Sequence, residues 1–308
     1  MTGIIKNLKI YKDARAFKNK FIQKLRKTIY QRGVNKTDLI LEVGPSHNPL
    51  FPKRKGWNVE IIDRLDQDGL KEHYKNDGVD LNDIEYVDYV WNGKSYVDSI
   101  KKENVYDYII ASHVIEHTTN LVGFLNDCSK LLKDEGCLRL VIPDRRYTFD
   151  HFRVVTGLGE VLNNYYYDDT INSPGIVGEY MSSVVSYKGK ILWKRKHLPF
   201  ANYWMDGNIR KYSFIHSDDV ALDWMDDVLK KGEYKDVHHY VFTTASFEYL
   251  IYELRQLGLI DLEIEKSLNI FGNEFMVDLR KKTADPVEDN RKKMRLLNRR
   301  NKESRIII

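Results

Sequence analysis

Two groups of polar side chains stand directly after apolar stretches that are expected to be strands. The first follows residues 107–111 and consists of Ser112, His113, Glu116 and His117. The second follows residues 137–142 and consists of Asp144, Arg145 and Arg146. Open α/β sheets bind their ligands outside the carboxyl ends of the strands. These two groups therefore indicate where the chemistry of the chain lies.

Proton transfer is one reaction that these residue types support, because imidazole and carboxylate groups act as general bases. His113 and Asp144 are the first candidates, since they follow neighbouring strands. The second candidates are His151, His238 and His239. The structural alternatives are that Asp144 pairs with Arg145 or Arg146, and that residues 238–239 anchor the helix after them. No three His, Asp or Glu residues show a recognisable metal spacing, so no metal is predicted.

The second strand end continues into a loop that is rich in cations and aromatic rings. Its members are Arg145, Arg146 and Arg153 together with Tyr147, Phe149 and Phe152. Guanidinium groups pair bidentately with phosphate or carboxylate, and rings pack on apolar surface such as sugar CH faces. The loop is typical of a site for a phosphorylated, nucleotide-linked or acidic sugar. The alternative is that the arginines neutralise acids of the chain itself.

The first predicted strand, 38–43, runs into the segment Glu42-Val43-Gly44-Pro45-Ser46. A buried strand that ends in an acid and a tight glycine turn is typical of nucleotide-cofactor sites, because glycine lets a ligand approach the backbone. Asp63 ends the next strand about twenty residues later, where an acid can accept hydrogen bonds from ribose hydroxyls. The pattern is not GxGxxG, which disfavours NAD. The alternative is an ordinary strand turn with a surface acid.

The hydrophobic pattern predicts a doubly wound, mostly parallel α/β sheet with an antiparallel closing strand pair. The expected strands are 38–43, 58–63, 86–91, 107–111 and 137–142, with the closing pair at 262–266 and 274–280. A helix at 121–132 is expected to end in a left-handed turn at Gly136. The segment 237–257 is read as a loop followed by a helix capped by Thr244 or Ser246.

These elements divide the chain into five parts. Apolar residues recur at helical spacing from Ile10 to Ile29, which predicts an amphipathic helix that Gly33 ends. The aromatic-rich segment after Arg153 predicts a mainly helical insertion that covers the site, and residues 285–305 predict a basic helical or disordered tail. The expected parts are an N-terminal helix (1–33), the α/β core (34–153), the covering insertion (154–236), the remainder of the core (237–280) and a basic tail (281–308).

The net charge of +4 combines two basic ends with an acidic middle. Residues 1–33 carry +9 and residues 280–308 carry +7, which leaves −12 for residues 34–279. The ends either lie against this acidic body or dock on an acidic partner or an anionic membrane surface. The acidic body argues against a nucleic-acid substrate. The chain has two cysteines, no signal-peptide pattern and no long apolar run, which favours a cytoplasmic location. Its basic ends add peripheral contact with the inner membrane surface as a second option.

Four motifs in this order resemble the class I S-adenosylmethionine-dependent methyltransferases. They are EVGPS, IIDR, YDYIIASHVIEH and LLKDEGCLRLVIPD. The segments PDRRYTFDHFR and VHHYVFT are similar to those of bacterial enzymes of surface-polysaccharide and sugar pathways. The resemblance covers roughly 38–153 and 237–280. The chain departs from the family in its glycine loop, where Ser46 and Asn48 stand in place of glycines.

The resemblance implies roles for individual residues. The methionine end of the cofactor would lie against Glu42, Gly44, Pro45 and Ser46. Asp63 and Arg64 would hold the ribose, and Trp91 and Asn92 would border the adenine. Ser112 and His113 would lie beneath the sulfonium, and His117 would either join them or serve in packing.

The expected activity is transfer of a methyl group from S-adenosylmethionine to a sugar hydroxyl in surface-glycan biosynthesis, with S-adenosylhomocysteine as product. Three alternatives stay open at this point. The acceptor could be the nitrogen of a phosphoramidate or an amino sugar, the chain could be a dinucleotide oxidoreductase, or it could be a non-catalytic scaffold with the same fold.

Overall fold

The computed structural model describes residues 24–168, 170–191, 209–269, 273–282 and 284–305. Its main feature is a seven-stranded sheet in the order β3-β2-β1-β4-β5-β10-β9. The strands are β1 (Ile40–Val43), β2 (Val59–Asp63), β3 (Tyr89–Val90), β4 (Tyr106–Ser112), β5 (Leu132–Pro143), β9 (Leu262–Leu268) and β10 (Glu274–Lys281). Strands β1 to β5 are parallel, and β10 is antiparallel to both β5 and β9. The predicted doubly wound sheet with its antiparallel closing pair is therefore confirmed.

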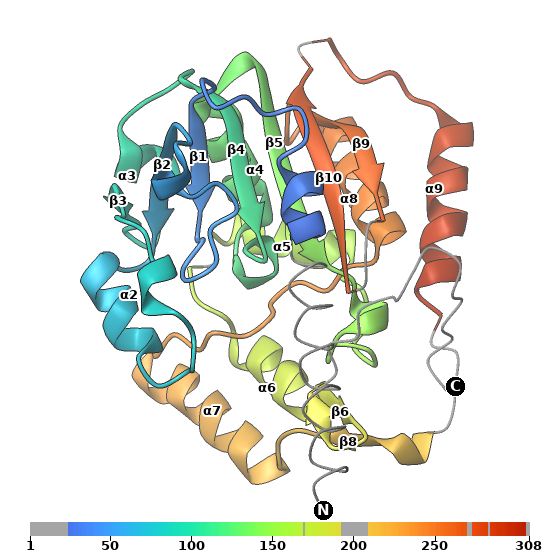
Figure 1. The fold of residues 1–308 in the computed structure, drawn as a ribbon. Helices are drawn as coiled ribbons and strands as arrows, with labels where there is room; N and C mark the ends of the chain where they lie inside the picture. The colour runs from blue at the N-terminus through green and yellow to red at the C-terminus, as the bar shows by residue number, and fades with distance from the viewer. Residues whose placement is uncertain (1–23, 169, 192–208, 270–272, 283, 306–308) are drawn as a thin grey trace, which may run out of the picture.

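Helices cover both faces of this sheet (Figure 1). They are α2 (Gln67–Tyr74), α3 (Tyr96–Ile100), α4 (Leu121–Leu131), α5 (Leu158–Tyr166) and α8 (Thr244–Gln256), with a further helical stretch at 24–30. Successive side chains of a strand point to opposite faces. In β4, Ile109 and Ala111 join the apolar cluster under α4 and α8, whereas Ile110 joins the cluster that holds Tyr30 of helix 24–30. Burial on both faces explains why the strands are nearly continuous apolar runs.

Several boundaries differ from the sequence-based expectation. Strand β3 has only two residues instead of six, and the N-terminal helix is described only from residue 24, so the stripe from Ile10 to Phe21 lies outside the described residues. Helix α8 is capped by Thr243, whose hydroxyl accepts from the Ser246 N–H at 3.2 Å, instead of by Thr244 or Ser246. The cap is one residue earlier because Thr243 is the last extended residue before the helix.

Gly136 lies within β5 and does not form a left-handed turn. Helix α4 ends at Leu131, and the chain enters β5 directly at Leu132. A Cβ atom at Gly136 would lie 2.9 Å from the Lys133 carbonyl oxygen and 3.0 Å from the Tyr106 carbonyl oxygen. Glycine is needed here because the backbones of β4 and β5 approach closely beside a register shift.

The segment after Arg153 forms a separate layer beyond the carboxyl ends of the parallel strands (Figure 1). It contains α6 (Pro174–Ser183), α7 (Asp218–Lys231) and a small antiparallel sheet of β6 (Val185–Tyr187), β7 (Lys190–Ile191) and β8 (Tyr212–Phe214). Its own apolar cluster is built from Val177, Met181, Ala221, Val228 and Val237. Helix α5, in contrast, contributes Val161 to the main core. The small sheet was not predicted, since its strands are too short to show an alternating pattern.

The basic C-terminal segment forms α9 (Asn290–Glu303), which lies along α8 (Figure 1). Lys293 pairs with Glu253 at 2.9 Å, and Arg299 pairs with Glu248 at 2.5 Å. These contacts show the basic segment lying against acids of the chain itself. Among the described residues, the structure contains no helix long and apolar enough to cross a membrane.

The close approach at Gly136 predicts that Gly136→Ala lowers the free energy of unfolding by about 1–3 kcal/mol, because the added methyl group must displace strand backbone. Chemical denaturation followed by circular dichroism measures the change. Gly159→Ala in α5 is the matched control, since a Cβ there meets nothing within 4 Å. The control is expected to be neutral or stabilising by up to about 1 kcal/mol. Equal effects of both substitutions would contradict the interpretation.

Candidate functional site

The order of the sheet reverses between β1 and β4, which are neighbours although β2 and β3 lie between them in the sequence. Open α/β sheets bind their ligands at such a switch point. Two hollows of about 470 Å³ and 220 Å³ open there. The residues that line both are Val43, Gly44, Ser46, Tyr74, His113 and His117. The two hollows therefore adjoin and form one candidate site.

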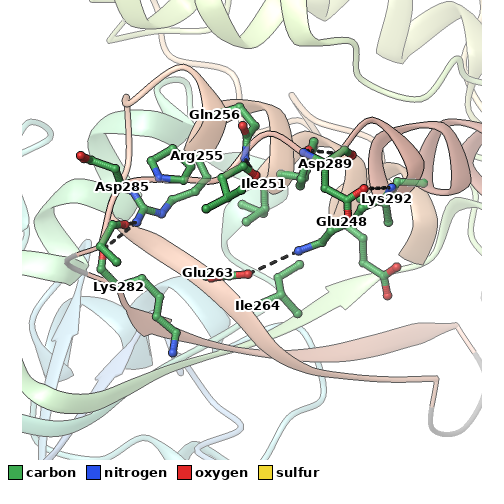
Figure 2. Close-up of a pocket in the computed structure, with 15 residues that line it drawn as sticks. Glu248, Ile251, Arg255, Gln256, Glu263, Ile264, Lys282, Asp285, Asp289 and Lys292 are labelled. Atoms are coloured by element: carbon green, nitrogen blue, oxygen red, sulfur yellow. Dashed lines mark hydrogen bonds and ion pairs between the residues drawn. The ribbon is translucent and has the colours of Figure 1, made fainter.

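A third hollow of about 510 Å³ lies between α8, β9 and the segment that leads into α9 (Figure 2). Its lining includes Tyr252, Arg255, Lys282 and Asp289. Lys282 follows the carboxyl end of antiparallel β10, so this hollow lies at the opposite edge of the sheet from the switch point. None of the predicted site residues lines it.

The turn after β1 is shaped for close approach of a ligand. Gly44 and Ser46 both have left-handed backbone angles, with φ of 59° and 48°. A Cβ at Gly44 would lie 3.1 Å from Val114 Cγ2. Glu42 is buried, and its carboxylate accepts the backbone N–H groups of Leu50 and Phe51 at 2.5 and 3.1 Å. Burial raises the pKa of Glu42 to about 7. Glu42 thus holds the loop while it lines the larger hollow.

The ends of β2 and β3 form the smaller hollow. The Asp63 carboxylate accepts the N–H of Ser46 at 2.9 Å and that of Arg64 at 2.8 Å, and burial raises its pKa. Trp91 stacks on Tyr96 with ring centroids 5.3 Å apart. Its indole Nε1 is buried without a hydrogen-bond partner among the described residues. Asp63, Arg64 and Trp91 therefore lie together as predicted, whereas Asn92 lines neither hollow.

Ser112 and His113 lie at the end of β4 and line the larger hollow. His113 has a left-handed φ of 55°, and its N–H donates to the Val141 carbonyl at 2.9 Å. Its ring lies between two carboxylates, with Nε2 2.8 Å from Glu274 and Nδ1 3.5 Å from Glu116. Burial lowers the pKa of His113, but the two carboxylates outweigh burial and raise it to about 9. The imidazolium form is favoured at neutral pH, which argues against the predicted role of general base.

Glu274 contacts the site residue His113 from behind the lining, and the sequence analysis missed it. Because β10 is antiparallel, its first residue lies at the carboxyl end of β5, where Glu274 pairs with Pro143. The carboxylate accepts from Tyr30 and pairs with Arg26, both in helix 24–30. Burial favours a higher pKa for Glu274, but His113 and Arg26 bring it down to about 2. The contact between Glu274 and His113 depends on the antiparallel pairing of β10 with β5, so residue spacing along the chain could not predict it.

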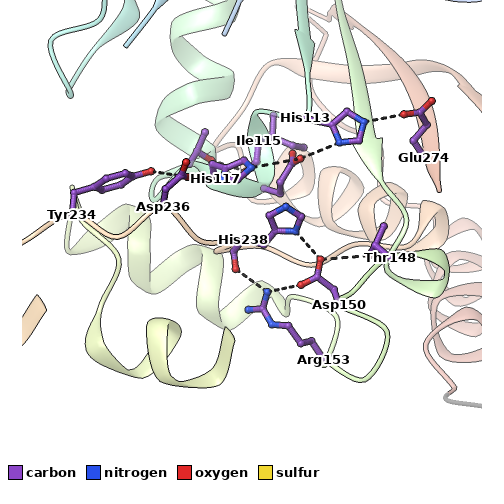
Figure 3. A network of polar contacts seen from close by, with 12 residues as sticks. His113, Ile115, His117, Thr148, Asp150, Arg153, Tyr234, Asp236, His238 and Glu274 are labelled. Atoms are coloured by element: carbon purple, nitrogen blue, oxygen red, sulfur yellow. Dashed lines mark hydrogen bonds and ion pairs between the residues drawn. The ribbon is translucent and has the colours of Figure 1, made fainter. Parts of the chain in front are cut away.

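A second group of histidines and acids includes His117, Asp236, His238 and Asp150 (Figure 3). Glu116 and His117 belong to the short 3-10 helix η3 (Ile115–His117), and His238 comes from the segment before α8. Each histidine has its Nδ1 on a carboxylate: His117 on Asp236 at 2.8 Å and His238 on Asp150 at 2.6 Å. One ligand atom from each of Glu116, His117 and His238 falls within 4.8 Å of the others. Sequence spacing did not predict this group because His238 arrives more than a hundred residues after His117.

The polar residues after β5 have structural contacts. Asp144 is 1% exposed and pairs with Arg146 at 2.6 Å, as the structural alternative had it, and it lines neither hollow. Arg145 donates to the carbonyls of His151, Arg153 and Ser304. Arg153 donates to Asp150 at 2.9 Å and to the His238 carbonyl at 2.8 Å.

These contacts change the expectation for the arginine loop. Arg145 and Arg153 are 3% and 2% exposed, so their guanidinium groups clamp the loop instead of reaching a substrate. Arg146 is partly buried and lies over the Tyr147 ring, 5.6 Å from its centroid. Neither Arg146 nor Tyr147 lines the two hollows. The geometry therefore does not support the expected contact of Arg145 and Arg153 with a phosphorylated substrate, because both side chains are buried and their terminal nitrogens donate to backbone carbonyls and to Asp150.

The remaining histidine candidates also lie outside the hollows. The His151 ring stacks on Tyr212 at 5.7 Å, and burial lowers its pKa to about 4. His239 is 2% exposed, with Nδ1 2.6 Å from Asn172 Oδ1 and Nε2 2.7 Å from Asn164 Nδ2. This arrangement suits a neutral ring that donates at one nitrogen and accepts at the other. His239 therefore anchors the segment before α8, as the structural alternative proposed, and only His238 of the pair reaches the site.

Comparisons with known proteins place the fold among loosely similar structures. No protein-family model matches the sequence, and no curated protein sequence matches it either. Among solved structures, a Burkholderia thailandensis 1,6-didemethyltoxoflavin N1-methyltransferase is 10% identical, with 88% of this chain and 84% of that chain covered and a TM-score of 0.41. The mitomycin 7-O-methyltransferase MmcR is also 10% identical, with 84% and 54% covered and a TM-score of 0.39.

A protein described as a zinc-dependent alcohol dehydrogenase from Rhodobacter sphaeroides is similar to the same degree. It is 13% identical, 83% of this chain and 88% of that chain are covered, and the TM-score is 0.44. This chain spans only about half of the mitomycin enzyme. Likenesses at this level assign no activity to this chain.

Burial of His239 as a neutral ring predicts a pH dependence of stability. Burial lowers its pKa from about 6.5 to about 4, so between these pH values the unfolded state binds the extra proton. The free energy of unfolding should fall as pH drops from 6.5 to 4, by up to about 3 kcal/mol from this ring. Denaturation of the wild type and of His239→Gln across this range measures it. The variant should show the shallower slope, and equal slopes would contradict the assignment.

Proposed function

We propose that this chain binds S-adenosylmethionine in the two adjoining hollows and transfers its methyl group to a hydroxyl of a small acceptor. The observation that supports this most is the meeting of four chain segments at the switch point: the Gly44 turn, Asp63, Trp91 and the end of β4. The resemblance of the sequence motifs to class I methyltransferases supports the same cofactor. The absence of a GxGxxG pattern at the Gly44 turn disfavours a dinucleotide.

The lining residues fit the parts of this cofactor. Asp63 offers carboxylate oxygens for ribose hydroxyls, and Trp91 offers a ring face together with an indole N–H that lacks a partner among the described residues. Gly44 lines both hollows at a left-handed position where a Cβ would crowd Val114. These groups suit the nucleoside end in the smaller hollow. Glu42, Ser46 and Ser112 line the larger hollow and suit the amino-acid end.

The proposed reaction is an in-line displacement. S-adenosylmethionine supplies a methyl group activated by its positive sulfur. The acceptor oxygen forms its bond to the methyl carbon as the carbon–sulfur bond breaks, and the hydroxyl proton leaves to a base or to solvent. The chain contributes positioning of the reactants and exclusion of water. Ser46 and His113, both with left-handed backbone angles, line the site, and the α6–α7 layer lies beyond it.

The acceptor side of the larger hollow favours a hydroxylated molecule. Arg26, Lys27 and Tyr30 of helix 24–30 line it, and Phe149 contributes an apolar ring. Hydrogen-bonding groups around one ring are typical of sugar sites. We therefore propose a sugar as acceptor, in a nucleotide-linked form or in a surface glycan. Arg26 and Lys27 take over the role of cationic contacts that the sequence had suggested for Arg145 and Arg153.

Cofactor binding predicts a specific loss at the ribose contact. Isothermal titration calorimetry with S-adenosylmethionine and S-adenosylhomocysteine should give one site per chain. Asp63→Asn should weaken binding by about 10- to 100-fold, because a charged hydrogen-bond acceptor is lost. Asp77→Asn changes an exposed acid outside both hollows and should leave the affinity unchanged. Absence of heat at millimolar ligand, from a folded wild type, would refute the proposal.

The acceptor proposal predicts a product with one added methyl group on a sugar. Nucleotide sugars, sugar phosphates and glycans are incubated with the chain and S-adenosylmethionine, and products are read by mass spectrometry. Gly44→Val should abolish the product, because the side chain clashes with Val114 at a left-handed position. Methylation of protein or RNA alone would overturn the sugar proposal while leaving cofactor binding intact.

A further inference from the structure

Glu116 is a buried acid without a hydrogen bond. The residue is 0% exposed, and neither carboxylate oxygen accepts a hydrogen bond from the part of the chain that the structure describes. Its nearest charged neighbours are His113 Nδ1 at 3.5 Å and His117 Nε2 at 4.0 Å. An ionised carboxylate loses several kcal/mol on leaving water unless it is paired or coordinates a metal ion. His113 supplies one positive charge beside Glu116, but at 3.5 Å it leaves both carboxylate oxygens without a hydrogen bond, so Glu116 can still act as a ligand.

Two histidines present suitable ligand atoms to this carboxylate. The Nδ1 atoms of His117 and His238 are engaged by Asp236 and Asp150, which leaves each Nε2 available. The two rings lie 4.8 Å apart and nearly perpendicular, at 88°. Metal-binding histidines almost always have their other ring nitrogen on a carboxylate or carbonyl, which fixes the ring orientation. Both histidines show this feature (Figure 3).

We propose that Glu116, His117 and His238 bind one divalent first-row transition-metal ion. Two imidazoles and one carboxylate form a ligand set that suits zinc, iron(II) or manganese(II), with coordination positions left open. The three candidate ligand atoms lie within 4.8 Å of one another. Bonds of about 2.0–2.2 Å place the ligands of a site roughly 3–4 Å apart, so binding draws these atoms together by about 1 Å. Rotation of the partly exposed His117 side chain supplies that movement.

The position of these ligands gives the ion a role in the proposed methyl transfer, and this role rests on the proposed function. Glu116, His117 and His238 line the larger hollow together with His113 and Phe149. An ion bound by these three residues would adjoin this hollow and could take a further ligand from it. A hydroxyl bound to a divalent ion loses its proton near neutral pH. The site would thus hold the acceptor oxygen and favour its alkoxide form, with the proton passing to solvent.

Metal binding is tested directly on the full chain, without S-adenosylmethionine. The protein is stripped with a chelator and titrated with Zn²⁺ by calorimetry, and the metal retained after gel filtration is counted by mass spectrometry. One ion per chain is expected. Glu116→Gln and His238→Gln should each abolish retention. Asp236→Asn should weaken binding by about 10- to 100-fold, because it releases the His117 ring. Co²⁺ should give a visible absorption band that these variants lose.

His216→Gln is the matched control, since the His216 ring lies beside Trp224, with centroids 6.5 Å apart, and lines neither hollow. It should retain one ion. His117→Gln serves as a further ligand variant because its side chain is 33% exposed and its removal leaves the core intact. Circular dichroism confirms that each variant is folded. Retention of the ion by Glu116→Gln, His117→Gln and His238→Gln, or no retention by the wild type, overturns the proposal. Cofactor titration of the stripped chain separates this failure from a failure of the methyltransferase proposal.

Discussion

The contact between His113 and Glu274 is the interaction on which the site depends most. It joins the end of parallel β4 to the first residue of antiparallel β10 at 2.8 Å. Glu274 also accepts from Tyr30 and pairs with Arg26, so the same carboxylate holds helix 24–30 over the larger hollow. A buried carboxylate is tolerated only with such partners. The one contact thus ties three distant chain segments to the edge of the sheet where the ligand site lies.

The buried charged groups of the loop after β5 are also paired. The Asp150 carboxylate is hydrogen-bonded to Arg153 and His238. Arg145 donates to carbonyls of its own loop and to that of Ser304. These contacts fasten the loop after β5 to the segment before α8, from which His238 and Asp236 reach the site. Most of these polar groups find their partners within the chain itself. Glu116 differs from Asp150 in that both oxygens of its buried carboxylate lack a hydrogen bond among the described residues.

Patterns along the chain predicted the sheet and identified the polar strand ends at Gly44 and Asp63, because both depend on local features. Apolar runs of strand length identified β1, β2, β4 and β5, and the Gly44 turn and Asp63 follow two of these strands. The prediction that Arg145 and Arg153 contact the substrate is not supported for a different reason. An arginine beside an aromatic residue gives the same sequence pattern whether its guanidinium group contacts a ligand or a buried carbonyl. The structure shows Arg145 and Arg153 buried, whereas Arg26 and Lys27, which spacing did not single out, line the hollow.

By itself the sequence determined the fold class, the polar residues that follow the parallel strands and the position of the glycine turn. These features follow from hydrophobic periodicity and turn chemistry within short stretches of the chain. The tertiary structure alone decided which polar residues meet. Glu274 reaches His113 through antiparallel pairing, and His238 reaches Glu116 from more than a hundred residues away. Side-chain burial and partners depend on the packing of segments that are remote in sequence, so the charge state of His113 and the grouping around Glu116 exist only once the chain is folded.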